Sequence, residues 1–315
     1  MKSFLGMSGG GDRGCVLVGI LDELHEMKGE TEIKWEQCAG ISAGALTAAM
    51  ISQTDEKSFR KMVKTLKNIF LQGGFHVVES WVYGGQVINM LDALIYHESI
   101  YQSTPMKNLI DQHFDENQIV RPFSVGAYNK TLCKYETFRS KDDVKDIKSA
   151  ILASAAVPVV LPSVQIDGYK YEDGGMRHLI PVIEIQEWVN KTTGPKHVDV
   201  LVCFPINNYE LFMKMTVPNT AYPLINNTVR SMCDVMLQQM QSDLKTLSQM
   251  VNVSYEIFTS NNCCEFTNGD LTIRVLSPKD GDFSSFIHMK PETSMKLFES
   301  GARAVREYLT PKLKV

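Results

Sequence analysis

One short stretch, Gly40-Ile41-Ser42-Ala43-Gly44, constrains the fold of this 315-residue chain more than any other. A serine between two glycines at this spacing is typical of a strand that turns abruptly into a helix, because the residues two before and two after the serine crowd each other. The flanking sequence agrees, since residues 35–39 predict a short buried strand and residues 43–50 predict a helix. Because the pattern is short, it also fits a glycine-bounded turn with an incidental serine.

A second glycine-rich segment, Gly9-Gly10-Gly11-Asp12-Arg13-Gly14, lies between a predicted first strand at 4–8 and a predicted amphipathic helix at 15–27. Its glycines match the dinucleotide-binding fingerprint, which also needs an acidic residue at the end of the next strand. That strand ends in Gly40-Ile41-Ser42, where there is no carboxylate. We therefore favour the alternative use of such a loop, in which glycine N–H groups surround a developing negative charge and Arg13 adds positive potential.

An acidic residue occurs in a third glycine-rich context. Residues 164–166 and 169–171 predict a hairpin that leads into Glu172-Asp173-Gly174-Gly175. An aspartate before glycine is commonly only a turn residue. A serine hydroxyl, however, needs a base before it can attack an ester, and a desolvated aspartate can serve as that base. None of the seven histidines has a convincing catalytic context, and the last, His288, is expected at the surface.

The rest of the chain alternates helices and strands without a linker, so we expect a single domain over 1–315. Helices are predicted at 54–70, 86–95, 105–114 (with Thr104 as the N-cap), 146–156, 228–251 and 292–309, and strands at 122–128, 132–139, 197–204, 256–258 and 271–275. The methionine stripe of 228–251 is expected in the core. The basic face of 54–70 is expected to be a solvated face, with a membrane-facing role as the alternative. Residues 73–85, rich in glycine and aromatics, fit either a lid or a packed loop.

Composition narrows the environment and the partners. A net charge of −4 and a pI of about 6.0 exclude the overall positive charge that is typical of nucleic-acid-binding proteins, so no nucleic-acid partner is expected. Seven cysteines without a C-x-x-C pair are interpreted as reduced, most of them buried, with Cys263 and Cys264 as surface thiols. The N-terminus lacks a signal-peptide core, and the longest apolar run, 150–161, is too short to span a bilayer. We expect a soluble, cytoplasmic protein whose membrane contacts are peripheral.

The three glycine motifs together, in this order along the chain, resemble the patatin-like phospholipase family. Residues 154–158 followed by Leu161-Pro162, and residues 99–109 with Thr104-Pro105, also resemble that family. The resemblance covers most of residues 3–204, whereas residues 205–315 show little family signal and are expected to extend the same domain.

This resemblance implies a three-layer α/β/α fold with a central, mostly parallel sheet, and hydrolysis of fatty-acyl esters of phospholipids or glycerolipids. It implies Ser42 as the nucleophile and Asp173 as the proton acceptor. The implied oxyanion hole comprises Gly9, Gly10, Gly11 and Ala43, with Gly10, Gly11 and Ala43 as the N–H donors. The supporting motif positions are Asp12, Arg13, Gly14, Gly40, Ile41, Gly44, Gly174 and Gly175. No metal or cofactor is implied. The chain departs from the family at Leu179, where many members have asparagine.

Three other functions remain open from the sequence. A soluble carboxylesterase or thioesterase would use the same residues on a different acyl substrate. A nucleotide-binding module would use the first glycine loop, although the missing ribose-binding acid argues against it. A catalytically inactive member that binds lipid is the third, and the intact pair of Ser42 and Asp173 argues against it.

Overall fold

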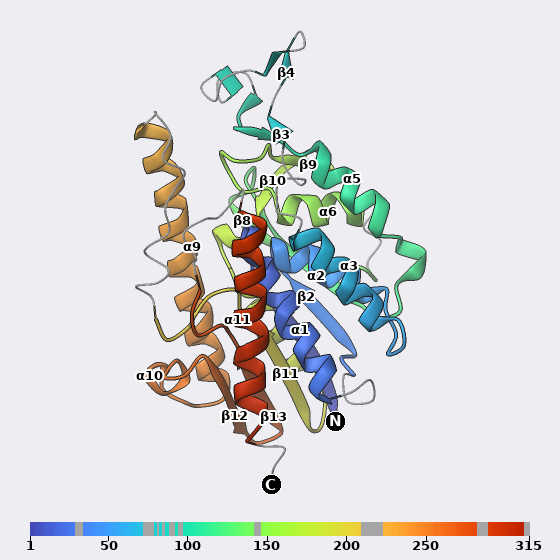
Figure 1. Ribbon diagram of the computed structural model, residues 1–315, viewed down its shortest axis with the longest axis vertical. Helices are drawn as coiled ribbons and strands as arrows, with labels where there is room; N and C mark the ends of the chain where they lie inside the picture. The colour runs from blue at the N-terminus through green and yellow to red at the C-terminus, as the bar shows by residue number, and fades with distance from the viewer. Residues whose placement is uncertain are drawn as a thin grey trace.

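A computed structural model describes residues 1–28, 34–71, 79–80, 82–83, 86–87, 92–93, 97–141, 146–208, 223–281 and 289–311. Its main feature is a nine-stranded sheet in the order β12-β13-β11-β1-β2-β7-β10-β9, with β8 also paired to β7 (Figure 1). The strands are β1 (Lys2–Met7), β2 (Gln37–Gly40), β7 (Phe123–Asn129), β8 (Lys134–Arg139), β9 (Val164–Ile166), β10 (Tyr169–Asp173), β11 (Lys196–Leu201), β12 (Cys263–Asn268) and β13 (Leu271–Leu276). The central strands β13, β11, β1, β2 and β7 are parallel, and the outer pairings are antiparallel.

Helices cover both faces of this sheet. They are α1 (Gly14–Lys28), α2 (Ala43–Ser52), α3 (Phe59–Leu71), α5 (Thr104–His113), α6 (Ile147–Ser154), α7 (Val182–Lys191), α9 (Pro223–Met250), α10 (Tyr255–Phe258) and α11 (Pro291–Leu309). Short 3-10 turns are η1 (Gly11–Arg13), η3 (Glu116–Gln118) and η4 (Gly174–Met176), and two small two-stranded sheets pair β3 (Glu79–Ser80) with β6 (Tyr101–Gln102) and β4 (Val82–Tyr83) with β5 (Gln86–Val87).

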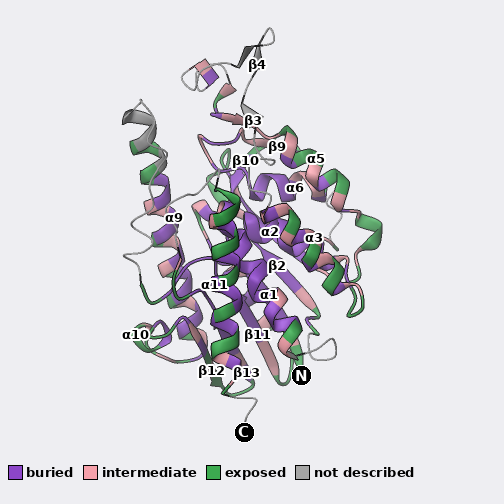
Figure 2. Ribbon diagram, in the orientation of Figure 1, coloured by how far each residue is buried: buried purple, intermediate pink, exposed green. Residues whose placement is uncertain are grey.

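The helices pack through the apolar stripes that the sequence carries. Helix α1 lies against α11, α3 and α2 in front of the sheet in Figure 1. Trp188 of α7 packs against Phe4, and Ile185 lies against Gly6, two positions along β1 on the same face of the sheet. Figure 2 shows the buried residues concentrated in the central strands and along most of α1. The methionine stripe of α9 is buried, as predicted, at Met232, Met236 and Met240.

The pairing of β7 explains how distant motifs meet. Strand β8 pairs with β7 along residues 124–129, so β2 and β10 share its other edge. Gly40 at the end of β2 pairs with Val125, and Asp173 at the end of β10 pairs with Ala127. Because β2 is parallel and β10 antiparallel to β7, their carboxyl ends converge from opposite directions on Gly126.

The predicted α/β fold with a mostly parallel central sheet is confirmed, and most predicted elements are present within a few residues. The strand predicted at 256–258 is wrong, because this segment is helix α10, in which the Ser254 hydroxyl accepts the Ile257 N–H at 3.4 Å. The helix predicted at 54–70 begins only at Phe59, since Asp55 accepts the Ser58 N–H at 2.8 Å in a separate turn.

Smaller corrections concern three other segments. Helix α5 includes Thr104, so Ser103 and not Thr104 occupies the N-cap position. Residues 86–87 form strand β5 and not the start of a helix, and much of 86–95 lies outside the described residues. Most of residues 73–85, expected to be a lid or a packed loop, and His288, expected at the surface, also lie outside the described residues. Cys264 is buried against the Phe258 carbonyl and is not a surface thiol.

The structure bears on the state of the cysteines and on membrane-spanning segments. All seven cysteines are free. Within the described ranges, no helix is both long and apolar enough to cross a membrane.

Candidate active site

Ser42 lies at the sharp turn between β2 and α2, in a backbone conformation that a serine rarely adopts. Its φ is 55° and its ψ is −121°, so the residue is outside the helix that follows it. The turn closes because both flanking glycines lack a side chain. A Cβ on Gly40 would lie 2.0 Å from the Gly44 carbonyl oxygen, and one on Gly44 would lie 2.3 Å from the Met7 carbonyl oxygen. The predicted strand-to-helix turn around Ser42 is therefore present.

Helix α6 holds this turn from the side. The Ser42 N–H donates to the Ser154 hydroxyl at 3.1 Å, and that hydroxyl donates to the Gly126 carbonyl at 2.6 Å. All of these groups are buried, and Ser154 has no exposed surface. One hydroxyl thus ties the strained residue to the point where β2 and β10 converge.

Asp173 lies at the end of β10, fully buried beside Ser42. Its own N–H donates to the Ala156 carbonyl at 2.9 Å, and its Oδ1 accepts the Gly175 N–H at 2.7 Å. Its Oδ2 receives no hydrogen bond of ordinary geometry from the described part of the chain. Burial raises the pKa of Asp173 to about 7, although the Ser42 hydroxyl and the Gly175 N–H both act in the opposite direction. A carboxyl group with this pKa can take up a proton near neutral pH.

The first glycine loop follows β1 and lies next to Ser42. A Cβ on Gly9 would be 3.1 Å from the Ser42 Cβ. The Gly9 N–H donates to the Leu179 carbonyl at 2.8 Å, so it is occupied within the protein. For Gly10, Gly11 and Ala43, by contrast, no acceptor pairs with the backbone N–H among residues that the structure describes. These three N–H groups are therefore available to an oxyanion, and Gly9 is placed to support the loop.

Arg13 does not reach solvent beside Ser42, because its side chain is completely buried beneath the loop. Its guanidinium lies 5.1 Å from the centre of the Phe204 ring and close to the thiols of Cys15, Cys203 and Cys233. Burial lowers the pKa of Arg13 to about 10, so the side chain remains cationic at neutral pH. It contributes a fixed positive charge below the loop.

The remaining motif residues hold the loops in place. Asp12 accepts the Met289 N–H at 2.9 Å, and the Ile41 N–H donates to the Met7 carbonyl at 3.2 Å. Gly14 and Gly174 are positions of close contact: a Cβ on Gly14 would lie 2.3 Å from the Phe70 ring, and one on Gly174 would lie 2.3 Å from the Gly126 carbonyl oxygen.

Asp243, which the sequence reasoning did not single out, contacts the loop that follows Asp173. Its carboxylate accepts the N–H groups of Leu179 and Ile180 and pairs with His178. Its sequence position could have identified it, because Asp243 is three residues after Met240 and so falls on the apolar stripe of α9, where a charged side chain is unusual. The cluster also shows that one of the seven histidines, His178, lies close behind the site.

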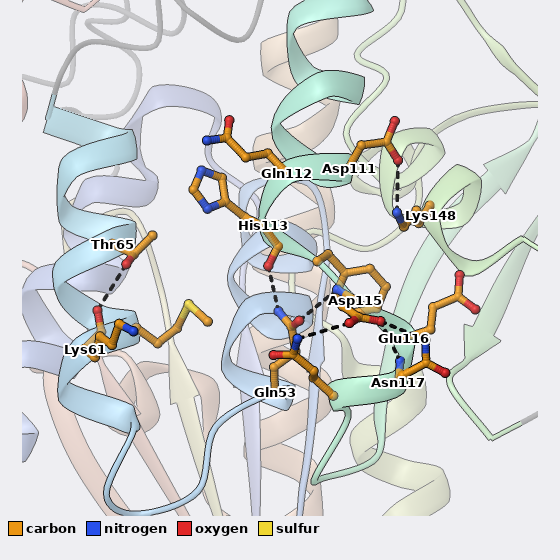
Figure 3. A pocket seen from close by; sticks show the side chains of 13 residues that line it. Gln53, Lys61, Thr65, Asp111, Gln112, His113, Asp115, Glu116, Asn117 and Lys148 are labelled. Atoms are coloured by element: carbon orange, nitrogen blue, oxygen red, sulfur yellow. Dashed lines mark hydrogen bonds and ion pairs between the residues drawn. The ribbon is translucent and has the colours of Figure 1, made fainter.

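A separate polar pocket of about 820 Å³ lies between α3 and the α5–η3 segment (Figure 3). Its groups largely pair with one another: the Gln53 amide donates to the His113 carbonyl at 2.9 Å, and Lys148 contacts Asp111 at 3.0 Å. Neither Ser42 nor Asp173 lines it, so it is not part of the candidate site.

The turn, the buried acid and the glycine loop all lie within a segment that a family comparison matches. A profile of the patatin-like phospholipase family matches residues 5–184. The chain belongs to the patatin-like phospholipase family. Membership of this family supports a lipid acyl hydrolase. No curated protein matches it significantly.

Solved structures resemble this patatin-like phospholipase at low sequence identity. Human GIVD cytosolic phospholipase A2, in complex with methyl γ-linolenyl fluorophosphonate, has a TM-score of 0.50 and 9% identity, covering 99% of this chain and 58% of its own. This likeness supports a shared fold. VipD from Legionella pneumophila has a TM-score of 0.45 and 14% identity, covering 98% of this chain and 67% of its own.

Proposed function

We propose that this patatin-like phospholipase cleaves fatty-acyl esters of phospholipids or glycerolipids through a dyad of Ser42 and Asp173. The observation that carries the proposal is the convergence of β2 and β10 on Gly126, which sets the strained Ser42 beside a buried carboxyl whose Oδ2 has no other ordinary partner in the described chain. No histidine is required, because an aspartate with a pKa of about 7 can itself accept the serine proton.

In the proposed reaction, Asp173 Oδ2 takes the proton as the Ser42 hydroxyl attacks the ester carbonyl. The oxyanion is stabilised by the N–H groups of Gly10, Gly11 and Ala43, and by the amino end of α2. The proton on Asp173 then passes to the leaving alcohol, and the acyl group stays on Ser42. Water, deprotonated by the same carboxylate, then attacks the acyl group on Ser42. The bond from the acyl carbon to Ser42 Oγ breaks, the fatty acid leaves, and Asp173 returns the proton to Ser42 Oγ.

We further propose that substrate is taken from a lipid surface by peripheral contact. Helix α3 exposes Arg60, Lys61 and Lys64 on one side while Phe59, Val63 and Leu66 pack in the core. Its carboxyl end reaches the glycine loop, where Phe70 lies against Gly14. A basic face at this position would attract anionic lipid headgroups. The seven free cysteines support a reducing, cytoplasmic compartment.

The dyad is tested with wild type, Ser42→Ala and Asp173→Asn. Both variants should lose at least about 10³-fold in kcat, because each removes a participant in the bond-making step. The assay should use a short soluble ester and phospholipid vesicles in parallel, with a fluorophosphonate probe to locate the labelled serine by mass spectrometry. Retention of more than a tenth of wild-type turnover by either variant would contradict the dyad.

The paired substrates also separate the candidate functions. Faster turnover of vesicle phospholipid than of the soluble ester supports the lipid hydrolase. Turnover of the soluble ester alone would indicate a carboxylesterase or thioesterase, and absence of both turnover and labelling would indicate a binding protein.

A further inference from the structure

Helix α9 places a carboxylate in the interior behind the candidate site. Asp243 is only 1% exposed. Its Oδ2 accepts the Leu179 N–H at 2.7 Å and the Ile180 N–H at 2.9 Å, and its Oδ1 lies 2.8 Å from His178 Nδ1. All three contacts are with one loop, residues 178–180, which comes from a distant part of the sequence. Asp243 also lies outside residues 5–184, the part matched by the family profile.

An acidic residue is unusual on the buried, apolar face of a helix, where Asp243 lies. Removal from water disfavours the ionised carboxyl and raises the pKa of Asp243, while His178 and the two N–H groups act in the opposite direction. For packing alone, an apolar side chain would serve the helix at least as well. What Asp243 adds is an acceptor for two adjacent backbone N–H groups, and this fixes the orientation of the loop.

The loop held by Asp243 leads directly to both halves of the candidate site. On one side it follows η4, where the Gly175 N–H donates to Asp173. On the other side, the Leu179 carbonyl accepts the Gly9 N–H at 2.8 Å. The Leu179 side chain lies against both glycines, with a Cβ on Gly9 falling 2.9 Å and one on Gly175 falling 3.0 Å from its Cδ1. The orientation of the Leu179 carbonyl therefore affects the position of Gly9, which immediately precedes Gly10 and Gly11.

The His178 side chain also joins the loop to strand β8. The His178 ring meets the edge of Tyr135 at 4.9 Å and 85°. The Tyr135 hydroxyl donates to Glu184 of α7 at 2.9 Å, and Thr137 donates to the same oxygen at 2.6 Å. Tyr135 packs against the His178 ring, whereas Asp243 binds both that ring and two backbone N–H groups of the loop.

We propose that Asp243 is a positioning residue for the oxyanion hole: through Leu179 it fixes the Gly9 peptide and thereby the direction of the Gly10 and Gly11 N–H groups. This inference rests on the proposed function, because it assigns those N–H groups to a transition state. It also gives the long helix α9 a task in catalysis, although no atom of α9 need touch the substrate.

The test compares Asp243→Ala and Asp243→Asn with Asp234→Ala, a matched control on the same helix at a half-buried position. Sites are counted by complete labelling with a fluorophosphonate, and kcat is expressed per labelled site on a soluble ester. Hydrogen exchange of the peptide containing residues 5–14 provides a readout that does not depend on activity. A variant that is merely less stable loses sites but keeps its kcat per site.

We expect Asp243→Ala to lower kcat per site at least about tenfold with KM nearly unchanged, and to speed exchange in residues 5–14. Asp243→Asn should recover most of the loss, because its amide oxygen can still accept both backbone N–H groups. Asp234→Ala should match wild type. If Asp243→Ala does not fold, Asp243→Thr, which is close to aspartate in volume, should show at least a threefold loss.

Wild-type kcat per site together with unchanged exchange in Asp243→Ala, or in its threonine substitute, would overturn the inference. If wild type itself neither turns over ester nor reacts with the probe, the proposed function fails. The positioning of the loop is then decided by hydrogen exchange alone, and unchanged exchange overturns it.

Discussion

Ser42 and Asp173 are each held in a state that an isolated residue would avoid. Ser42 has a positive φ, which costs roughly 1–3 kcal/mol for a residue with a side chain. Asp173 is a carboxyl group without exposed surface. The surrounding contacts compensate both costs, and the result is a serine hydroxyl beside a carboxyl group of raised pKa.

The raised pKa of Asp173 predicts that activity depends on pH. Because burial raises the pKa of Asp173 to about 7, the base is protonated and inactive below that pH and ionised above it. The value of kcat/KM for a soluble ester should rise about tenfold per pH unit below 7 and level off above it. A rate that stays flat from pH 5 to 9 would contradict the assignment, and the rate of labelling by a fluorophosphonate should follow the same curve.

Single contacts between elements decide whether these residues meet. Helix α6 is short, yet it reaches both convergent strands through Ser154, which accepts from Ser42 and donates to Gly126. The segment after α6 adds the Ala156 carbonyl, which accepts the Asp173 N–H. One helix end therefore sets the distance between the candidate nucleophile and the candidate base.

Replacement of Ser154 tests this role of α6. Ser154→Ala leaves the buried Ser42 N–H and Gly126 carbonyl unpaired, so the free energy of unfolding should fall by about 1–3 kcal/mol. The turnover number should fall about tenfold or more, because the strained turn can relax. Urea unfolding and ester hydrolysis measure the two effects. Ser149→Ala on the same helix is the control, since the Ser149 hydroxyl hydrogen-bonds to Asp146 near the start of the helix.

At the scale of the molecule, the carboxy-terminal part completes the sheet that the motif-bearing part begins. Strand β13 pairs with β11, and α11 packs along α1. Across this junction the buried Asp199 accepts from Arg274 at 2.6 Å and from the Trp35 indole N–H at 2.8 Å, and it pairs with His197. These contacts hold the pKa of Asp199 well below its usual range. We propose that residues 1–315 fold as one domain.

Loss of Arg274 should therefore destabilise the whole protein. Arg274→Met leaves Asp199 buried without its main counter-charge, and the expected loss is about 3–5 kcal/mol in the free energy of unfolding. Arg303→Met removes an exposed ion pair with Asp280 and should cost less than about 1 kcal/mol. Chemical denaturation of both variants gives the comparison. Equal stability of the two would show that the Asp199 cluster does not join the halves of the sheet.

The local geometry of the chain follows from residues that are neighbours in the sequence. Glycines two residues either side of Ser42 predict the turn, because backbone crowding is a property of the adjacent residues alone. Periodicity likewise located most helices and strands. The predicted strand at 256–258 is wrong, because three residues contain too little periodic information to separate a strand from one turn of helix.

Which distant groups meet depends on how the strands pair and the helices pack. The shared edge of β7 brings Ser42 to Asp173. The motif alone places the Gly9 N–H in the oxyanion hole, whereas in the structure this N–H donates to the Leu179 carbonyl. Asp243 reaches the same loop from a helix whose sequence showed only a buried stripe with one acid in it. Strand register and helix packing join residues far apart in the chain, and the sequence pattern reports only on residues within a few positions of one another.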